Sequence, residues 1–211
     1  MSFFRKIRKS VYNSKNKESK IDSEAIFSLS SATITLETKQ GLKPTGRCAL
    51  TVKSTSGLYF NEMKDEILRF LAISKPDLQF DYRTVVDSYG YLWLILAGRT
   101  IEDALAAITA VVDTIQEKGF SSQILASVFE FGLQHKPAII ENNTKNENNN
   151  ENSAWYLIYN YKSNKFYPFV PLFGKKTRDT ESEMRVMATL QEEIPFEKDM
   201  SMWYPIWDLP F

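Results

Sequence analysis

The sequence predicts an α+β protein, with a mainly antiparallel sheet built from hairpins and with helices packed on that sheet. Strand-like segments come in pairs joined by turn residues, and segments of helical periodicity stand between the pairs. No repeated strand–helix–strand crossover is apparent, which argues against a parallel sheet. We therefore expect one domain over residues 21–211, with helices that begin near Asn61, Thr100 and Thr180.

The first predicted hairpin joins ATITLETK, at residues 32–39, to GRCALTVK, at residues 46–53. In both stretches apolar side chains recur at every second position, as they do in strands. The intervening QGLKPTG contains the glycine and proline residues typical of a connection. The alternating apolar positions are Ile34 and Leu36 in the first strand and Cys48, Leu50 and Val52 in the second.

The next predicted element is a helix with Asn61 as its N-cap, and Pro76 is expected to follow its end. Its apolar face would consist of Met63, Ile67, Phe70 and Leu71.

Two strands follow this helix. LQFDYRTVV alternates apolar with polar residues, which predicts a strand with one face in solvent. After the turn DSYG, the stretch YLWLILAG is apolar on both faces, so we expect it at the centre of the sheet.

The clearest predicted helix begins after Thr100, which can form a capping box with Asp103. Gly119 stands where a helix commonly ends with a glycine. The apolar positions follow the helical repeat: Ile101, Ala104, Leu105, Ile108, Val111, Val112 and Ile115.

Two further strands, SQILASVFEF and AWYLIYNY, flank a polar tract, and its Asn-rich part at residues 141–153 is predicted to be a flexible loop rather than a functional lid. A second turn at Ser163 and Asn164 leads to a return strand, KFYPFVP. Because Pro168 and Pro171 lack the N–H that a central strand donates, we expect this strand at an edge.

The last predicted helix begins at Thr180, which can form a capping box with Glu183. The apolar stripe of this helix would consist of Met184, Met187, Leu190 and Ile194.

The inventory of catalytic residues is thin. His135 is the only histidine and Cys48 the only cysteine, and Cys48 lies on the apolar side of a predicted strand. The phosphate-binding, nucleophile-elbow and zinc-protease motifs are all missing from the sequence. Most carboxylates fall in first helical turns, where they complement the helix dipole. We therefore expect no catalytic, cofactor or metal site, and a protein that is not an enzyme.

Charge divides the chain into a basic N-terminal arm, residues 1–20, and an acidic remainder. The arm carries seven basic side chains and one acidic one, whereas the rest carries 19 basic and 25 acidic side chains. An acidic body argues against nucleic-acid binding. The pattern of a basic interfacial helix, which would contact an anionic membrane surface or a partner, is formed by Phe3, Phe4, Arg5, Lys6, Ile7, Arg8, Lys9 and Val11. A solvated terminus, or packing of the arm on this domain or a second copy, is the alternative.

The C-terminal stretch DMSMWYPIWDLPF is rich in aromatic residues, and its two prolines exclude a regular helix. We expect this extended segment to dock on the protein's own sheet or helices, with presentation to a partner as the alternative. Together with the preceding strand and helix start, it predicts an interaction surface made of Tyr167, Phe169, Arg178, Asp179, Trp203, Tyr204 and Trp207.

Three stretches resemble one family: DMSMWYPIWDLPF with its W-[YF]-P-x-W block, NKFYPFVP followed by RDTESE, and SATITLETKQGLKPTGRCAL. The family is PspAB, the phage-shock-protein-A-associated proteins, and the likeness covers about residues 21–211, with the Asn-rich tract as an insertion. The resemblance implies an accessory factor of the envelope-stress response. Its implied partners are a PspA-like protein, which polymerises on damaged membranes, or a membrane metalloprotease of the HtpX type. It implies no catalytic activity.

Two functions thus remain. The first is a non-catalytic adaptor that acts through protein contact and membrane-surface contact, and the second is an enzyme with a carboxylate site using Asp87, or Asp179 with Arg178. An adaptor should show an apolar groove, and an enzyme a cleft with converging carboxylates of perturbed pKa. The single cysteine, and the lack of any apolar run near the roughly 18–20 residues that span a bilayer, favour a cytoplasmic protein, peripheral to the membrane at most.

Overall fold

The structure is a computed structural model that describes residues 24–78, 80–133, 154–172, 174 and 176–211. The N-terminal arm and the Asn-rich tract at 141–153 lie outside these residues. The described helices and strands are α2 (Glu24–Gln40), β1 (Leu42–Lys53), α3 (Leu58–Leu78), β2 (Asp81–Val86), β3 (Tyr91–Ala97), α4 (Ile101–Glu117), β4 (Ile124–Leu133), β5 (Trp155–Asn160), β6 (Lys165–Phe169) and α5 (Thr180–Leu190).

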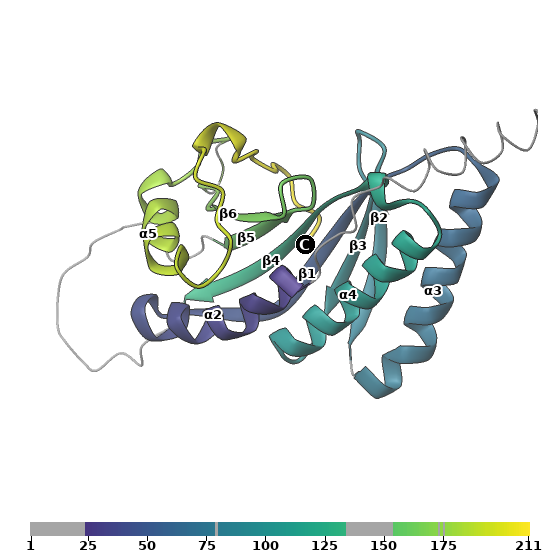
Figure 1. Cartoon of the computed structure of the whole chain (residues 1–211), viewed down its shortest axis with the longest axis horizontal. Helices are drawn as coiled ribbons and strands as arrows, with labels where there is room; N and C mark the ends of the chain where they lie inside the picture. The colour runs from purple at the N-terminus through teal and green to yellow at the C-terminus, as the bar shows by residue number, and fades with distance from the viewer. Residues whose placement is uncertain (1–23, 79, 134–153, 173, 175) are drawn as a thin grey trace, which may run out of the picture.

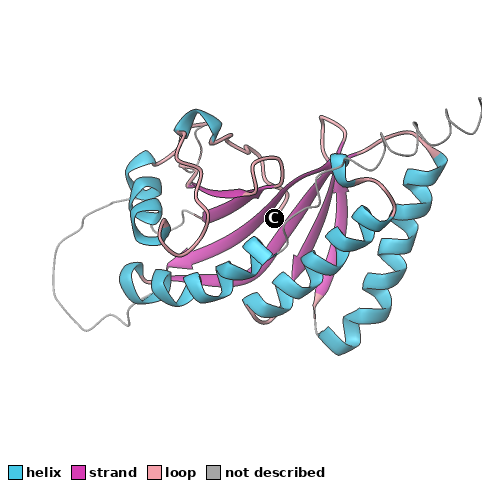
Figure 2. Ribbon diagram, in the orientation of Figure 1, coloured by secondary structure: helices cyan, strands magenta, loops and turns pink. Residues whose placement is uncertain are grey.

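The described strands form one six-stranded sheet in the order β2-β3-β1-β4-β5-β6. Every neighbouring pair in this sheet is antiparallel, which confirms the predicted fold class. Figure 1 shows α2, α3 and α4 over one face of the sheet, and Figure 2 shows the strands fanning out behind them. The larger hydrophobic core lies between this face and these helices, and Val186 and Leu190 of α5 also belong to it.

The first predicted strand is wrong, because residues 32–39 belong to helix α2. Ile34 and Leu36 would share a face in a strand, but Leu36 is buried and Ile34 is 69% exposed. The eight predicted strand residues are only part of a longer segment, and the pattern of burial over that whole segment is helical. Over the whole segment the buried positions recur at helical spacing: Ile26, Leu29, Ala32, Thr33 and Leu36.

Because residues 32–39 do not form a strand, β1 has no hairpin partner there. It pairs instead with two strands that follow later in the chain, β3 on one side and β4 on the other. Most of the expected connection, residues 40–46, is part of β1, which begins at Leu42 and contains an irregularity between Pro44 and Cys48. Gly46 allows this bulge: its φ is +77°, and a side chain there would collide with the carbonyl oxygen of Gly98.

Helix α4 is as predicted. Thr100 and Asp103 form the capping box, and Gly119 follows the helix with a φ of +79°. Helix α3 begins at Leu58, before Asn61, and it includes Pro76 in its last turn, contrary to the prediction that Pro76 follows the end. Pro76 removes the hydrogen bond that its N–H would donate to the carbonyl of Ala72, so its effect is confined to the last turns of the helix.

Strand β3 is buried on both faces, as expected, but it is second from the edge, and β1 and β4 occupy the centre. Strand β6 is an edge strand as predicted. The backbone of residues 195–197 lies along its outer side, where the Phe166 N–H donates to Pro195 O and the Glu197 N–H donates to Phe166 O.

The start of α5 differs from the prediction. Asp179, rather than Thr180, is the N-cap, because its carboxylate accepts hydrogen bonds from the backbone N–H and the hydroxyl of Ser182. Glu183 is therefore not part of a capping box, and its side chain is fully buried. The predicted apolar stripe is also only partly correct: Leu190 and Ile194 are buried, but Met184 is 36% exposed and Val186 takes a buried position.

Candidate binding trough on the second face of the sheet

The second face of the sheet is covered by the C-terminal segment, residues 203–211, which we call the strap. Its side chains join a smaller hydrophobic core on this face. Trp203 is 2% exposed, and Ile206, Trp207, Leu209 and Phe211 are partly buried. The strap therefore docks on its own domain, as the sequence predicted for this segment.

The strap is held at both of its ends. At β6, the Tyr167 hydroxyl donates to the backbone oxygen of Tyr204 at 3.1 Å. Near the chain end, Arg83 reaches over from β2 and donates to the backbone oxygen of Pro210. Phe211 stacks on Tyr156 of β5, with 5.5 Å between the ring centroids. These contacts draw the strap from the β6 edge towards the middle of the sheet.

Beneath the strap, side chains from neighbouring strands stand in register. One row across the sheet consists of Ile95, Ala49, Val128, Ile158 and Tyr167, all of which belong to the smaller core. Two residues further along the strands, a second row consists of Val85, Trp93, Thr51, Ala126 and Asn160. All five residues of this second row line a large pocket, for which they form the floor.

This pocket, which we call the trough, has a volume of about 1220 Å³. The strap forms one wall of the trough with residues 204–208 and Pro210. The opposite wall comes from the β2–β3 turn at residues 87–91, from Ser121 and Ser122, and from the β5–β6 turn at Tyr161 and Lys162. Seven tyrosine and tryptophan residues, the exposed Tyr89 among them, are part of the lining, and aliphatic, proline and polar residues complete it.

Thr51 is the polar group at the middle of the floor. It lies in register between Trp93 on β3 and Ala126 on β4. The residue is 4% exposed, and its hydroxyl has no hydrogen-bond partner among the described residues. A buried polar group without a partner costs free energy, so this hydroxyl has an unused hydrogen-bonding capacity, although neighbouring atoms cover it in this structure.

Asp87, by contrast, is fully engaged in local structure. Its carboxylate accepts hydrogen bonds from the backbone N–H groups of Tyr89 and Tyr91 and from the indole Nε1 of Trp93, each at 2.9 Å. Burial alone would raise the pKa of Asp87, but these hydrogen bonds outweigh burial and lower the pKa below its ordinary value. Asp87 thus fixes the turn and the Trp93 ring, and remains ionised at neutral pH.

The two lysines that line the trough differ in whether they form an ion pair. Lys176 pairs with Asp208 of the strap at 3.2 Å, and both side chains are well exposed. Within the described part of the chain, Lys162 has no ion-pair partner. Lys162 lies in the β5–β6 turn, at the opposite end of the floor from Asp87.

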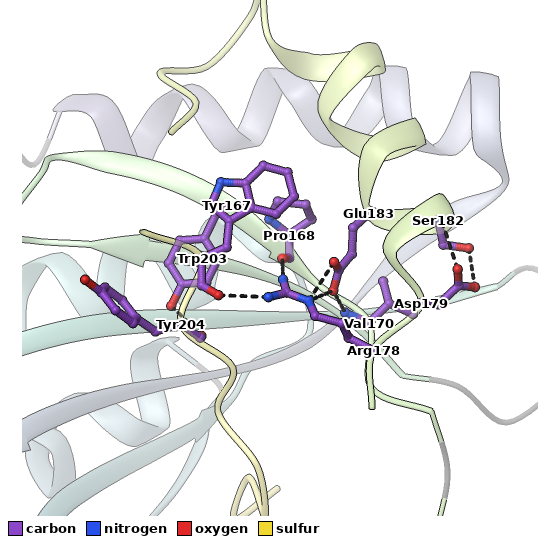
Figure 3. A network of polar contacts seen from close by, with 9 residues as sticks. All are labelled: Tyr167, Pro168, Val170, Arg178, Asp179, Ser182, Glu183, Trp203 and Tyr204. Carbon is purple, nitrogen blue, oxygen red and sulfur yellow. Dashed lines mark hydrogen bonds and ion pairs between the residues drawn. The ribbon is translucent and has the colours of Figure 1, made fainter. Parts of the chain in front are cut away.

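A second polar cluster, centred on Arg178, joins β6, α5 and the strap (Figure 3). The Arg178 Nε donates to both carboxylate oxygens of Glu183 at 2.8 and 2.7 Å. Its two terminal nitrogens donate to the backbone oxygens of Trp203 at 2.8 Å and of Pro168 at 3.1 Å. Glu183 also accepts from the backbone N–H of Val170 at 2.9 Å.

The buried position of the Glu183 carboxyl shifts its pKa. Burial raises this pKa above its ordinary value, and the hydrogen bonds from Arg178 and Val170 act in the opposite direction. The cluster is a structural joint, because each of its donors is used to hold two or three segments of the chain together.

The seven residues predicted as an interaction surface do lie close to this joint, but the structure buries several of them. Phe169, Tyr167 and Trp203 are at most 3% exposed. Arg178 and Asp179 are engaged with Glu183 and Ser182. Tyr204, which is 51% exposed, lines the trough together with Trp207 and the inner side of Tyr167. Of the seven residues, only Tyr167, Tyr204 and Trp207 line the trough.

Sequence reasoning missed Thr51, Trp93 and Lys162 as site residues. The alternation of β1 carried a signal for the first of them. Since Cys48, Leu50 and Val52 face the helices, Thr51 has to face the other side. The pairing that places Thr51 beside Trp93 joins strands about 40 residues apart, and local patterns do not specify such a register.

The remaining sequence candidates lie apart from the trough. Cys48 is buried on the helix-covered face, where burial raises the pKa of its thiol. His135 and the arm residues from Phe3 to Val11 fall outside the described residues. Within the described ranges, no helix is both long enough and apolar enough to cross a membrane.

The fold defines the class of protein: an α+β domain whose antiparallel sheet is backed by helices on one face and covered in part by its own C-terminal segment on the other. The family model of PspAB, PspA associated protein B, matches residues 1–211, and the chain belongs to this family. The resemblance seen in the sequence is thereby confirmed, and the family name links the chain to PspA. No curated protein and no solved structure matches the chain.

Proposed function

We propose that this protein is a non-catalytic adaptor of a PspA-linked membrane-stress response, and that it binds a protein partner through the trough. The observation that carries the proposal is the trough itself, a large aromatic-lined hollow beside the strap. Family membership supports the choice of PspA as the partner.

The aromatic rim supports protein binding. Tyr89 is 83% exposed and Tyr204 is 51% exposed, and both line the trough. Tyrosine and tryptophan are enriched among the residues that contribute most to binding free energy, because they offer a large apolar area with a polar tip. Burial of one such side chain contributes roughly 1.5–3 kcal/mol.

The state of the carboxylates favours binding over catalysis. Asp87 is saturated with hydrogen bonds and has a lowered pKa, whereas a general base is most effective with a pKa near the working pH. Asp208 is exposed and paired with Lys176. Asp179 caps α5, and Arg178 is bound to Glu183, so the second carboxylate site considered from the sequence is committed to structure as well.

Two finer parts of the proposal concern attachment to the membrane and a second partner. The basic arm at residues 1–20 would hold the protein at the cytoplasmic, anionic face of the membrane, where each basic side chain contributes about 1 kcal/mol. A membrane metalloprotease of the HtpX type is the second partner that the family resemblance implies. In both cases the trough would remain open to the protein partner.

The test is capture of PspA from a lysate of the source organism by the tagged full-length chain. Tyr89→Ala removes an exposed ring at the rim of the trough, and we expect it to weaken capture about tenfold. Tyr59→Ala is the matched control, because Tyr59 is 76% exposed on α3, which packs on the other face of the sheet. Capture that is lost equally in both variants would reject the trough as the interface, and absence of PspA from the captured material would reject the adaptor function.

A further inference from the structure

We propose that the open part of the trough binds an extended, proline-containing peptide segment of about six residues, which carries a carboxylate and lies alongside the strap. This inference rests on one part of the proposed function, namely that the trough is the binding site. It does not depend on PspA being the partner. Size, the strap, Thr51 and Lys162 each point to this class of ligand.

The dimensions of the trough suit a peptide better than a small metabolite. Its volume of about 1220 Å³ exceeds the range of about 300–1,000 Å³ that is usual for small-molecule pockets. The floor extends from Val85 on β2 to Asn160 on β5, which is four inter-strand intervals of about 4.8 Å, or about 19 Å. An extended chain that advances about 3.1–3.4 Å per residue covers this distance with about six residues.

The strap shows which kind of segment this face of the sheet accepts. It is extended, it contains Pro205 and Pro210, and two of its backbone oxygens accept hydrogen bonds from the side chains of Tyr167 and Arg83. Recognition on a sheet face uses side chains, so the backbone N–H groups of a ligand would find few acceptors. Proline removes such N–H groups and favours the extended form, which is why aromatic grooves recognise it.

Thr51 supplies a place for one ligand carbonyl. Its buried hydroxyl lacks a partner among the described residues, and it lies at the centre of the floor. A peptide that runs across the strands parallel to the strap would bring a carbonyl oxygen over this hydroxyl. The contact would repeat the one that Tyr167 makes with the strap.

The charges of the trough set the position of the carboxylate. Asp87 at one end is saturated, and Lys176 is paired with Asp208 of the strap. Lys162, at the β5–β6 end, has no ion-pair partner within the described residues, so an acidic side chain of the ligand would be placed there. The strap again provides the precedent, since its own acidic residue lies beside a lysine.

The probe is a fluorescein-labelled peptide, acetyl-Tyr-Pro-Ile-Trp-Asp-Leu-Pro-amide, measured by fluorescence polarisation with the full-length chain. We expect saturable binding, about tenfold weaker when both prolines of the peptide are replaced by alanine. Lys162→Glu should weaken binding about tenfold or more, and Thr51→Val, which fits a strand and removes the hydroxyl, about fivefold. Lys39→Glu, at the exposed end of α2, should leave binding unchanged.

Three outcomes would overturn the inference. These are no saturable binding of the peptide, equal binding of its alanine version, and binding that is unaffected by both Lys162→Glu and Thr51→Val. The last result would mean that the peptide displaces the strap instead of lying beside it. Capture of PspA without peptide binding would reject this inference alone, whereas peptide binding without PspA capture would reject only the proposed adaptor function.

Discussion

Replacement of Arg178 by methionine tests whether the joint between β6, α5 and the strap depends on a buried charge. In the native protein the Glu183 side chain is fully buried and Arg178 is 22% exposed. Arg178→Met keeps much of the side-chain volume but leaves the Glu183 carboxylate without its cation. Removal of one partner from a buried pair costs roughly 3–5 kcal/mol. For a chain of this size, that loss corresponds to a decrease in Tm of about 6–20 °C.

The pH dependence of this effect separates charge from packing. Burial raises the pKa of Glu183 above its ordinary value of 4.5, so the folded protein holds this proton more tightly than the unfolded chain does. The contribution of this group to stability is therefore largest at low pH and declines as the pH rises through the folded pKa. Without Arg178 the folded pKa rises further. The difference in Tm between the native chain and Arg178→Met should thus be smaller near pH 5 than near pH 8.

The assay is thermal unfolding followed by circular dichroism at both pH values, with Lys176→Met as the control. The Lys176–Asp208 pair is largely exposed, and such pairs contribute at most about 1 kcal/mol. The double variant Arg178→Met/Glu183→Leu should recover part of the loss, because no charge remains buried. The Tm of the double variant should stay below that of the native chain, since the Val170 N–H and the Trp203 oxygen lose their partners. The reasoning is refuted if the loss in Arg178→Met is the same at both pH values.

Three further predictions concern other parts of the chain. Trp203→Ala should cost roughly 3–5 kcal/mol and lower Tm by about 6–20 °C, because Trp203 is 2% exposed and its indole donates to the Glu197 oxygen. Tyr204→Ala should stay within about 1 kcal/mol, and equal losses in the two variants would contradict the burial argument. The thiol of Cys48, whose pKa is raised by burial, should react with a thiol reagent more than about a hundredfold slower in the folded protein than in denaturant; rapid labelling of the folded protein would show that the thiol is accessible. Deletion of residues 1–20 should abolish salt-sensitive co-sedimentation with anionic vesicles, and undiminished binding would exclude the arm as a membrane anchor.

Local sequence patterns determined the elements whose stabilising contacts are close in the chain. The capping box of Thr100 and Asp103, the apolar face of α4 and the glycine after it all lie within 20 residues, and the structure has each of them. The turn between β5 and β6 is also as predicted, with Asn164 at a φ of +54°. The fold class followed from the same patterns, because the order of strands and helices is itself a property of the sequence.

Tertiary structure decided the conformation of residues 32–39, because their alternation favours a strand but burial of Ala32, Thr33 and Leu36 against the sheet selects the helix. It also decided the role of Glu183, which has the spacing of a capping residue but is drawn inward by Arg178. The trough depended on tertiary structure most of all. Its floor consists of single residues from five strands, and the register that aligns Thr51 with Trp93 and Ala126 is set by packing between segments far apart in the sequence.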